Sequence, residues 1–212
     1  MCIANGCENT HLSLQVSFVR GVIVRRSEIR DHLLKTALRL FNEKGYQATG
    51  VDLIIAESGV AKTTLYRHFE TKEDLIVAAL ERRDEEDRRE MREFVEKRAS
   101  DPAERILLTF DFLQIWFKDK DFRGCSFMAA AGEHKDIADP VFRAASMHKR
   151  LTLAYFEELA HAARFRDPRR LADEINILHE GATAVAQVVR SAEPGRQAKR
   201  MATAILTTME RD

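Results

Sequence analysis

Every proline in this chain stands where a helix should begin. Pro102, Pro140 and Pro168 each follow an aspartate, which can cap a helix whose first residue is the proline. Pro194 follows Glu193 and gives a weaker version of the same pattern. A proline inside a helix would cost about 3 kcal/mol. Because the 212 residues contain only these 4 prolines, no proline interrupts the apolar periods between them.

Between these starts, apolar residues recur at the three- and four-residue spacing of a helix. Ile29, Leu33, Ala37 and Leu40 show this spacing before Gly45, which can end a helix. With only 9 glycines, a turn-rich β protein is disfavoured. We therefore predict an all-α fold of nine helices. Their expected ranges are 28–44, 51–58, 62–68, 72–98, 102–119, 124–134, 140–164, 168–190 and 195–209.

Residues 1–24 follow a different pattern. From Leu12 to Phe18, apolar and polar residues alternate with the period of two that suits a β-strand. One strand alone has no partner to pair with. The segment lacks the basic region and the cleavage site of a signal peptide. We interpret residues 1–24 as a flexible extension, with an ordered peripheral arm as the alternative.

Residues 49–75 predict two short helices joined by a tight turn. Thr49 and Asp52 have the form of a capping box for the first helix. Gly59 can adopt the positive φ that the turn requires. The second helix, residues 62–68, then follows with a polar outer face. Two short helices in this arrangement form a helix-turn-helix.

The outer face of the second helix has the chemistry that DNA binding needs. Lys62, Thr63 and Thr64 stand at the helix N-terminus, the part of a recognition helix that reaches base edges. Residues just beyond them can donate hydrogen bonds to phosphates. An ordinary helical hairpin with a solvated face is the alternative. The residues assigned to DNA contact are Thr49, Lys62, Thr63, Thr64, Tyr66, Arg67, His68 and Lys72.

The segment from Ala37 to Glu73 contains several short motifs at characteristic distances from one another. They are Ala37, Leu40-Phe41, Gly45, Gly59-Val60, Thr64-Leu65-Tyr66, His68-Phe69 and Lys72-Glu73. With these motifs, the segment resembles the DNA-binding domain of the tetracycline-repressor (TetR) family of bacterial transcription regulators. Two positions depart from that pattern: Ala61 replaces the usual serine cap, and Ile55 stands where alanine is common. The missing cap would be worth about 1 kcal/mol.

The resemblance implies an all-α homodimer that binds a palindromic operator. It also implies a C-terminal domain that binds a small-molecule effector. We accordingly divide the chain after the extension into a helix-turn-helix domain, residues 25–72, and an effector-binding and dimerisation domain, residues 73–212. Residues 25–72 carry nine Lys and Arg against six Asp and Glu, a modest excess of positive charge.

The expected helix at 102–119 is apolar on two sides, so both sides must be buried. Such a helix is well placed to wall a cavity for a small hydrophobic or amphipathic effector. His134 and His148 are possible polar anchors in it. The alternative is that the aromatic residues are ordinary core. The candidate lining residues are Phe112, Trp116, Phe127, Met128, His134, Phe142, Met147, His148 and Tyr155.

Cys125 has two interpretations. Beside Arg123, it could be an oxidisable sensor thiol, or it could be a small buried hydrophobe. No histidine pair has the spacing of a helical metal site, and no G-x-S-x-G elbow supplies a nucleophile. We therefore expect no metal, no cofactor and no catalytic residues.

The last two expected helices carry apolar seams suited to packing against other helices. Two such helices from each protomer would form a four-helix interface about a two-fold axis. Packing within one chain is the alternative. The residues assigned to the dimer interface are Leu171, Ile175, Leu178, Ala182, Val185, Val189, Met201 and Ile205.

Together these features predict a cytoplasmic, nucleoid-associated regulator that is not an enzyme. We expect a repressor that leaves double-stranded operator DNA when the effector binds. No apolar stretch approaches the roughly 18–20 residues of a membrane span, so a membrane partner is not expected. One rival hypothesis keeps the DNA-binding class but replaces the effector with oxidation of Cys125. A second is a helical small-molecule carrier or enzyme without an operator.

Overall fold

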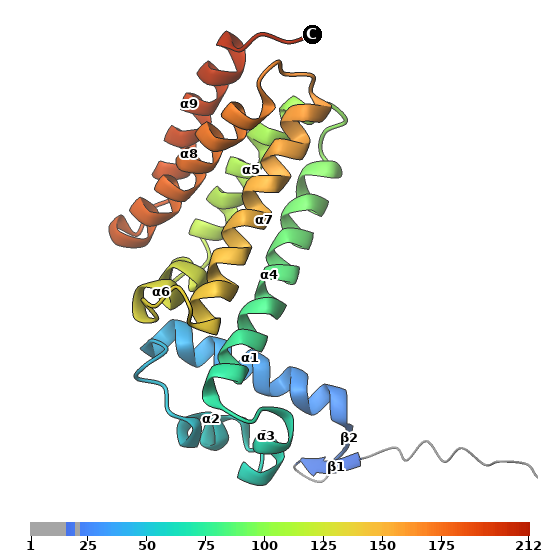
Figure 1. The fold of residues 1–212 in the computed structure, drawn as a ribbon, viewed down its shortest axis with the longest axis vertical. Helices are drawn as coiled ribbons and strands as arrows, with labels where there is room; N and C mark the ends of the chain where they lie inside the picture. The colour runs from blue at the N-terminus through green and yellow to red at the C-terminus, as the bar shows by residue number, and fades with distance from the viewer. Residues whose placement is uncertain (1–15, 20–21) are drawn as a thin grey trace, which may run out of the picture.

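The computed structural model describes residues 16–19 and 22–212. In that part of the chain a group of short helices lies at one end of a bundle of longer ones (Figure 1). The helices are α1 (Arg26–Lys44), α2 (Val51–Ser58), α3 (Lys62–His68), α4 (Lys72–Glu96), α5 (Pro102–Phe117), α6 (Ser126–Glu133), α7 (Pro140–Ala162), α8 (Pro168–Val189) and α9 (Glu193–Thr208). The predicted all-α architecture of nine helices is confirmed for these residues.

The aspartate caps behave as the sequence predicts. The side chain of Asp101 accepts a hydrogen bond from the backbone N–H of Ala103 at 3.0 Å, and a proline begins α5. Asp139 and Asp167 cap α7 and α8 in the same manner. Each cap satisfies an N–H group that the helix leaves without an internal partner. Local sequence therefore determines where these three helices begin.

The predicted cap of α2 is wrong. Gly50, not Thr49, occupies the N-cap position. The Thr49 side chain is instead fully buried, and its hydroxyl donates to the backbone carbonyls of Leu40 at 3.2 Å and Gly45 at 2.7 Å. Thr49 therefore ties the loop after α1 to that helix.

Two short strands precede α1. β1 (Val16–Val19) pairs antiparallel with β2 (Val22–Arg25), with Val16 opposite Arg25. The strand expected at residues 12–18 thus has a partner that sequence analysis missed. Residues 1–15 and 20–21 lie outside the described residues, and the flexibility expected of residues 1–24 stays a prediction.

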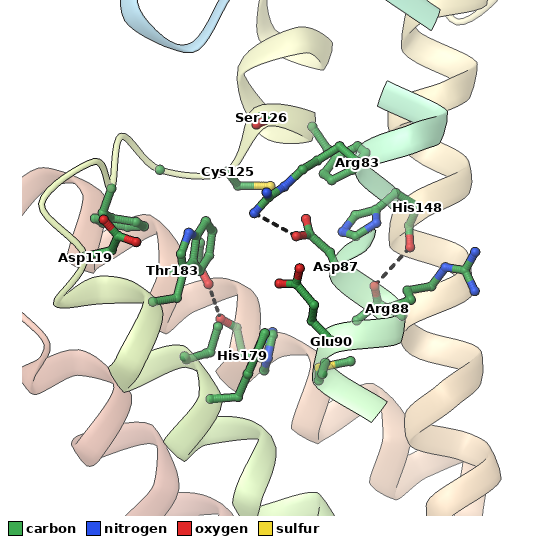
Figure 2. Close-up of a pocket in the computed structure, with 18 of the residues that line it drawn as sticks. Arg83, Asp87, Arg88, Glu90, Asp119, Cys125, Ser126, His148, His179 and Thr183 are labelled. Carbon is green, nitrogen blue, oxygen red and sulfur yellow. Dashed lines mark hydrogen bonds and ion pairs between the residues drawn. The ribbon is translucent and has the colours of Figure 1, made fainter. Parts of the chain in front are cut away.

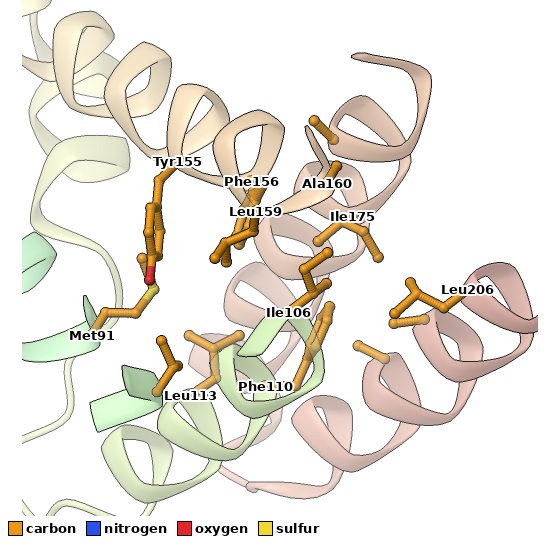
Figure 3. Close-up of a cluster of buried hydrophobic side chains, with 14 of the residues drawn as sticks. Met91, Ile106, Phe110, Leu113, Tyr155, Phe156, Leu159, Ala160, Ile175 and Leu206 are labelled. Atoms are coloured by element: carbon orange, nitrogen blue, oxygen red, sulfur yellow. The ribbon is translucent and has the colours of Figure 1, made fainter. Parts of the chain in front are cut away.

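The described residues form two hydrophobic cores. One joins α1–α3 and the start of α4 to α6 and the first turns of α7. The other fills the bundle of α4, α5, α7, α8 and α9, where Phe110, Phe156 and Ile175 interdigitate (Figure 3). The long helix α4 contributes to both cores. The first core therefore extends beyond residue 72 and joins the short helices to the bundle.

Candidate DNA-binding face and central cavity

Helix α3 presents a polar face to solvent. Its Leu65 is buried with Phe69 in the core that α3 shares with α1 and α2. Lys62, Thr63 and Tyr66 are exposed on the opposite side. Gly59 takes a φ of 67° at the end of α2, which fixes the turn between the two helices. The arrangement is a helix-turn-helix with an accessible second helix.

Cations surround the base of α3. His68 is half-buried, and burial together with Arg26, Arg30 and Arg67 lowers its pKa below the usual value. A neutral His68 can still donate one N–H to a phosphate, but it adds no charge. Arg30 lies 5.4 Å from the centre of the Phe69 ring. Arg26 and Arg30 are not among the residues assigned to DNA contact from the sequence, because they belong to α1, 30 or more positions before the recognition helix.

Two of the predicted DNA ligands are engaged within the chain, and a third is buried. Lys62 Nζ lies 3.0 Å from Asp52 on α2, and this hydrogen bond raises the pKa of Lys62. Lys72 Nζ donates to the carbonyl of Gln47 at 3.4 Å. Thr49 is a correction, because its side chain is buried and cannot reach DNA. The side chains of Thr63, Tyr66 and Arg67 on α3 are exposed and accessible to DNA.

A cavity of about 400 Å³ lies above this end, between α4, α5, α6, α7 and α8 (Figure 2). We call it the central cavity. Met91, Phe112, Leu113, Trp116, Phe122 and Phe127 supply its apolar wall. Its volume and mixed lining are typical of a small-molecule site.

Four of the predicted lining residues reach the central cavity: Phe112, Trp116, Phe127 and His148. The other five do not. His134 is buried outside it, with Nδ1 2.9 Å from Asp139, and Tyr155 packs beside Met91 in the bundle core (Figure 3). Met128, Phe142 and Met147 lie on α6 and α7 faces that point elsewhere. Helical periodicity alone left open which side of each helix meets the cavity.

The polar wall of the central cavity includes two ion pairs. Arg83 lies 2.7 Å from Asp87, and Lys149 Nζ lies 2.6 Å from Glu180. Burial raises the pKa of Asp87 to about 6, although Arg83 opposes the shift and Glu90 adds to it. Paired charges on an apolar wall suit an amphipathic molecule better than a pure hydrocarbon.

Two histidines of the cavity wall are kept neutral. Burial lowers the pKa of His148 to about 4, although Asp84, 2.8 Å from its Nδ1, opposes the shift. The His148 ring stacks on Phe127 with 3.6 Å between ring centres. Burial also lowers the pKa of His179 to about 3. Among the residues that the structure describes, none forms a hydrogen bond with Nε2 of His179, a cavity residue that sequence analysis did not select.

Helix α6 connects the central cavity to the DNA-binding end. At its start, the carbonyl of Ser126 accepts from the Tyr46 hydroxyl at 3.0 Å, and the Ser126 hydroxyl donates to Asn42 at 2.8 Å. At its end, Glu133 accepts from the backbone N–H groups of Tyr46 at 2.9 Å and Gln47 at 2.7 Å. We call these four hydrogen bonds the α6 clamp. Because Ser126 also lines the cavity, the clamp joins the two sites directly.

Comparison with known proteins agrees with this architecture. A sequence model described as "Bacterial regulatory proteins, tetR family" matches residues 33–79. SCO4454, a TetR-family transcriptional regulator from Streptomyces coelicolor, is 30% identical in sequence, and its crystal structure superimposes with a TM-score of 0.71. That match covers 83% of this chain and 96% of SCO4454. The chain belongs to the TetR family.

The chain is also similar to curated HTH-type transcriptional regulators. The HTH-type transcriptional regulator LmrA of Bacillus subtilis is 29% identical over 169 residues, which is 78% of this chain and 89% of LmrA. The HTH-type regulator YerO of the same organism is 32% identical over 52% of this chain, but the match spans only 34% of YerO. TetR-family regulators bind operator DNA and act as dimers.

The exposed apolar face of α8 and α9 differs from the predicted dimer seam. Leu171, Ile175 and Ala182 are buried in the core of their own chain, so they have almost no surface to offer a partner. Leu178 and Ile205 are half-buried against that core. Leu171, Ile175 and Ala182 therefore pack within their own chain, as the open alternative has it. The predicted residues that remain exposed are Val185, Val189 and Met201.

Two residues that sequence analysis missed complete this face. Ile177 is 69% exposed and Val188 is 80% exposed. With Gly181 and Val185 between them, they follow helical spacing along the outer side of α8. We call Ile177, Val185, Val188, Val189 and Met201 the α8–α9 face. Helix α8 therefore carries two apolar stripes, of which only one is covered.

Among all the residues that the structure describes, no helix combines the length and apolar character needed to cross a membrane. Within the same residues, no group of three or more His, Cys, Asp or Glu side chains is arranged to hold a metal ion.

Proposed function

We propose that this protein is a homodimeric transcriptional regulator that leaves a palindromic operator when a small amphipathic molecule fills its central cavity. Helix α3 reads base edges with Thr63 and Thr64, while Tyr66 and Arg67 bind phosphates. Support comes from the exposure of this face and from the cations around it. Phosphate contacts position such a protein, and base contacts give its sequence preference.

The α6 clamp is the observation that carries the proposal. A molecule in the central cavity contacts the wall formed by Ser126 and Phe127. Displacement of α6 would strain the hydrogen bonds that hold the loop at Tyr46 and Gln47. That loop lies between α1 and α2, so its movement changes the position of α3. An effector lowers operator affinity only to the extent that it prefers the displaced conformation.

The α8–α9 face supports dimerisation. Its exposed aliphatic side chains form a patch that solvent would hydrate unfavourably in a monomer. Pairing two copies about a two-fold axis buries the same patch on both protomers. In the dimer, the two α3 helices are about one DNA turn apart, roughly 34–36 Å.

Selection from random double-stranded DNA tests the DNA-binding part. The purified full chain should enrich a palindrome, and its affinity should fall steeply with salt because phosphate binding releases counterions. Enrichment of no sequence would contradict the proposal.

A matched pair of variants tests the cavity. Small molecules are first screened for release of the selected operator. Phe112→Ala removes a side chain from the cavity wall and should weaken binding of the active molecule. Phe142→Ala, on a face of α7 outside the cavity, should leave that binding unchanged. Equal effects of the two variants on release would place the effector elsewhere.

A further inference from the structure

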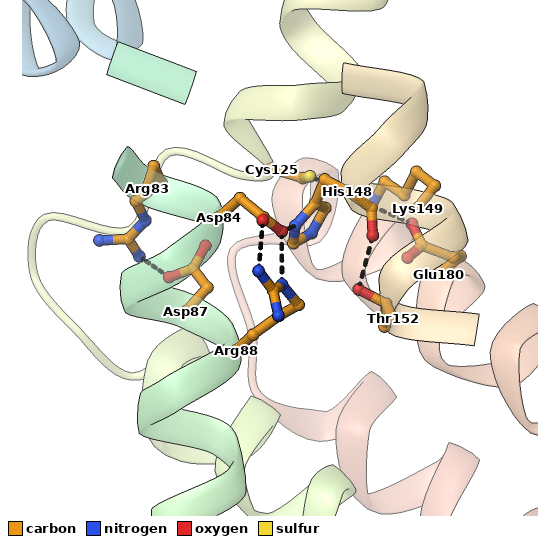
Figure 4. Close-up of polar contacts among 9 residues, drawn as sticks. All are labelled: Arg83, Asp84, Asp87, Arg88, Cys125, His148, Lys149, Thr152 and Glu180. Atoms are coloured by element: carbon orange, nitrogen blue, oxygen red, sulfur yellow. Dashed lines mark hydrogen bonds and ion pairs between the residues drawn. The ribbon is translucent and has the colours of Figure 1, made fainter. Parts of the chain in front are cut away.

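The central cavity contains a thiol with a partly buried ammonium beside it. Cys125 lines the cavity and occupies the N-cap position of α6. Lys149 Nζ, on α7, lies 3.3 Å from Cys125 Sγ and 2.6 Å from Glu180 (Figure 4). Arg123, which sequence analysis placed beside the thiol, instead donates to the carbonyls of Lys120 and Phe122. The cation next to the sulfur therefore comes from a helix distant in sequence.

The Lys149 ammonium keeps its charge. Burial lowers the pKa of Lys149, but the Cys125 sulfur and the Glu180 carboxylate together raise it above the usual value. A permanent cation at hydrogen-bond distance stabilises negative charge on sulfur, and the thiolate is the nucleophilic form of cysteine. Lys149 is thus placed to activate Cys125.

A second residue of the cavity, His179, has a buried ring nitrogen without a hydrogen-bond partner among the described residues. His179 is buried, lines the same cavity, and has an Nε2 atom that no described residue satisfies. A neutral imidazole can donate one N–H, and a carbonyl oxygen accepts it. A buried donor without a partner carries a free-energy cost. A carbonyl-bearing molecule in the cavity would remove that cost.

We propose that the central cavity takes soft carbon electrophiles with a conjugated carbonyl group and binds them covalently at Cys125. This proposal rests on the proposed function and specifies its effector class. Cys125 is buried, so the electrophile must first enter the cavity to reach Sγ. Lys149 acts on the sulfur, and His179 acts on the carbonyl oxygen.

The addition is balanced without any other reactant. The Cys125 sulfur forms a bond to the β-carbon, and the carbon–carbon π bond breaks, so that its electron pair moves toward the carbonyl oxygen as an enolate. The proton that the thiol gave up then returns to the α-carbon. The product is a saturated thioether, and nothing is oxidised or reduced.

The adduct would act on the DNA-binding end through α6. Cys125 immediately precedes Ser126, whose hydroxyl and carbonyl belong to the α6 clamp. New bulk on Sγ would displace the first turn of α6. Covalent attachment would therefore release the operator by the route proposed for a reversible effector, but the release would persist after free electrophile is removed.

The experiment uses N-ethylmaleimide as the probe. The full chain carries two further cysteines, so a Cys2→Ser/Cys7→Ser background leaves Cys125 as the one thiol. Intact-mass spectrometry should show one N-ethylmaleimide added per chain at neutral pH. The reagent should add to Cys125 about tenfold faster than it adds to free glutathione. Lys149→Met should slow the addition about tenfold, and Lys149→Arg should restore most of it. Glu180→Gln should speed the addition, because the Lys149 ammonium then has no carboxylate beside it and Cys125 Sγ is its anionic partner.

The outcomes separate this proposal from the function on which it rests. Addition no faster than with glutathione, or equal rates for folded Lys149→Met and the background protein, would overturn it. If Lys149→Met does not fold, the arginine and Glu180→Gln variants decide by the same comparison. Operator release by N-ethylmaleimide that persists in Cys125→Ser would also overturn it. Fast addition with no operator selected would instead refute the proposed function and leave the thiol chemistry in place.

Discussion

Glu133 Oε1 accepts a hydrogen bond from the backbone N–H of Tyr46 at 2.9 Å, across 87 positions of the chain. The other carboxylate oxygen takes the N–H of Gln47. One side chain at the end of α6 therefore satisfies two consecutive donors in the loop that precedes the helix-turn-helix. The ring of Tyr46 is buried and stacks on Phe41 with 4.9 Å between centres, so the loop has little freedom of its own.

Glu133→Gln should weaken the α6 clamp. The amide keeps one acceptor oxygen but presents an NH₂ group to the other backbone donor. The expected loss is about 1–2 kcal/mol in the free energy of unfolding, since hydrogen bonds to charged groups are the stronger ones. Urea denaturation measures it. Glu93→Gln on the exposed side of α4 is the control and should change little. Equal losses would show that the clamp adds no stability.

Thr63→Ala should change which operator sequences are preferred. Thr63 is exposed near the N-terminus of α3, and one base contact carries about 1–3 kcal/mol of discrimination. Random-site selection with each protein detects the change. Thr203→Ala, at an exposed position of α9, should select the original sequence. An unchanged consensus for Thr63→Ala would remove Thr63 from base readout.

Lys72→Ala should weaken binding to all DNA sequences alike. We propose that its ammonium binds a phosphate in the DNA complex in place of the Gln47 carbonyl, so its loss should reduce the slope of log affinity against log salt by about one unit. Lys97→Ala provides the comparison, because Lys97 is exposed at the opposite end of α4. Fluorescence anisotropy over a salt series gives both slopes, and identical slopes would contradict the assignment.

Val188→Arg should separate the protomers without unfolding them. The side chain is 80% exposed in one chain, and in the proposed dimer it becomes an unpaired buried charge, which costs several kcal/mol. Ile137→Arg is matched in exposure, at 77%, but lies away from the α8–α9 face. Sedimentation should give a monomer for the first variant and a dimer for the second, with equal helical content by circular dichroism. A dimeric Val188→Arg protein would place the interface elsewhere.

Acidification should destabilise the fold through its buried histidines. The folded pKa values of His148 and His179 are lowered to about 4 and about 3, from an unfolded value near 6.5. The unfolded chain therefore binds more protons between roughly pH 4 and 6.5, and stability must fall as pH falls through that window. Asp87, with its pKa raised to about 6, acts in the opposite direction. His179→Gln should reduce by about one the number of protons taken up on unfolding in this window, so stability should depend less on pH. Melting temperature measured against pH tests this.

The starts of α4, α5, α7 and α8 were predictable because the signals that begin these helices are local. A cap such as Asp139 with its proline, or Thr71 with Asp74, needs no information beyond a few neighbouring residues. The outer face of α3 was predictable for the same reason. Pairing of β1 with β2 was not, because alternation identifies one strand without naming its partner.

The cavity and the dimer face were only partly predictable. Lys149 contacts Cys125, and His179 lines the same cavity, because α7 packs against both α6 and α8. No spacing in the sequence records that contact. For α8, the stripe through Ile175 and the stripe through Ile177 both have helical period, and burial alone distinguishes them.

If α3 binds DNA as proposed, the ion pair between Lys62 and Asp52 affects how the protein distinguishes its operator from other DNA. Phosphates are the same along every stretch of DNA, so a free lysine at the tip of α3 would adhere to all of them equally. Here a carboxylate from the neighbouring helix already occupies that ammonium at 3.0 Å. Random DNA offers it only an exchange of one anion for another. In the proposed complex, an operator that also engages the base-reading side chains of α3 would supply the additional contacts that make the exchange favourable, so Lys62 would favour the operator over random DNA.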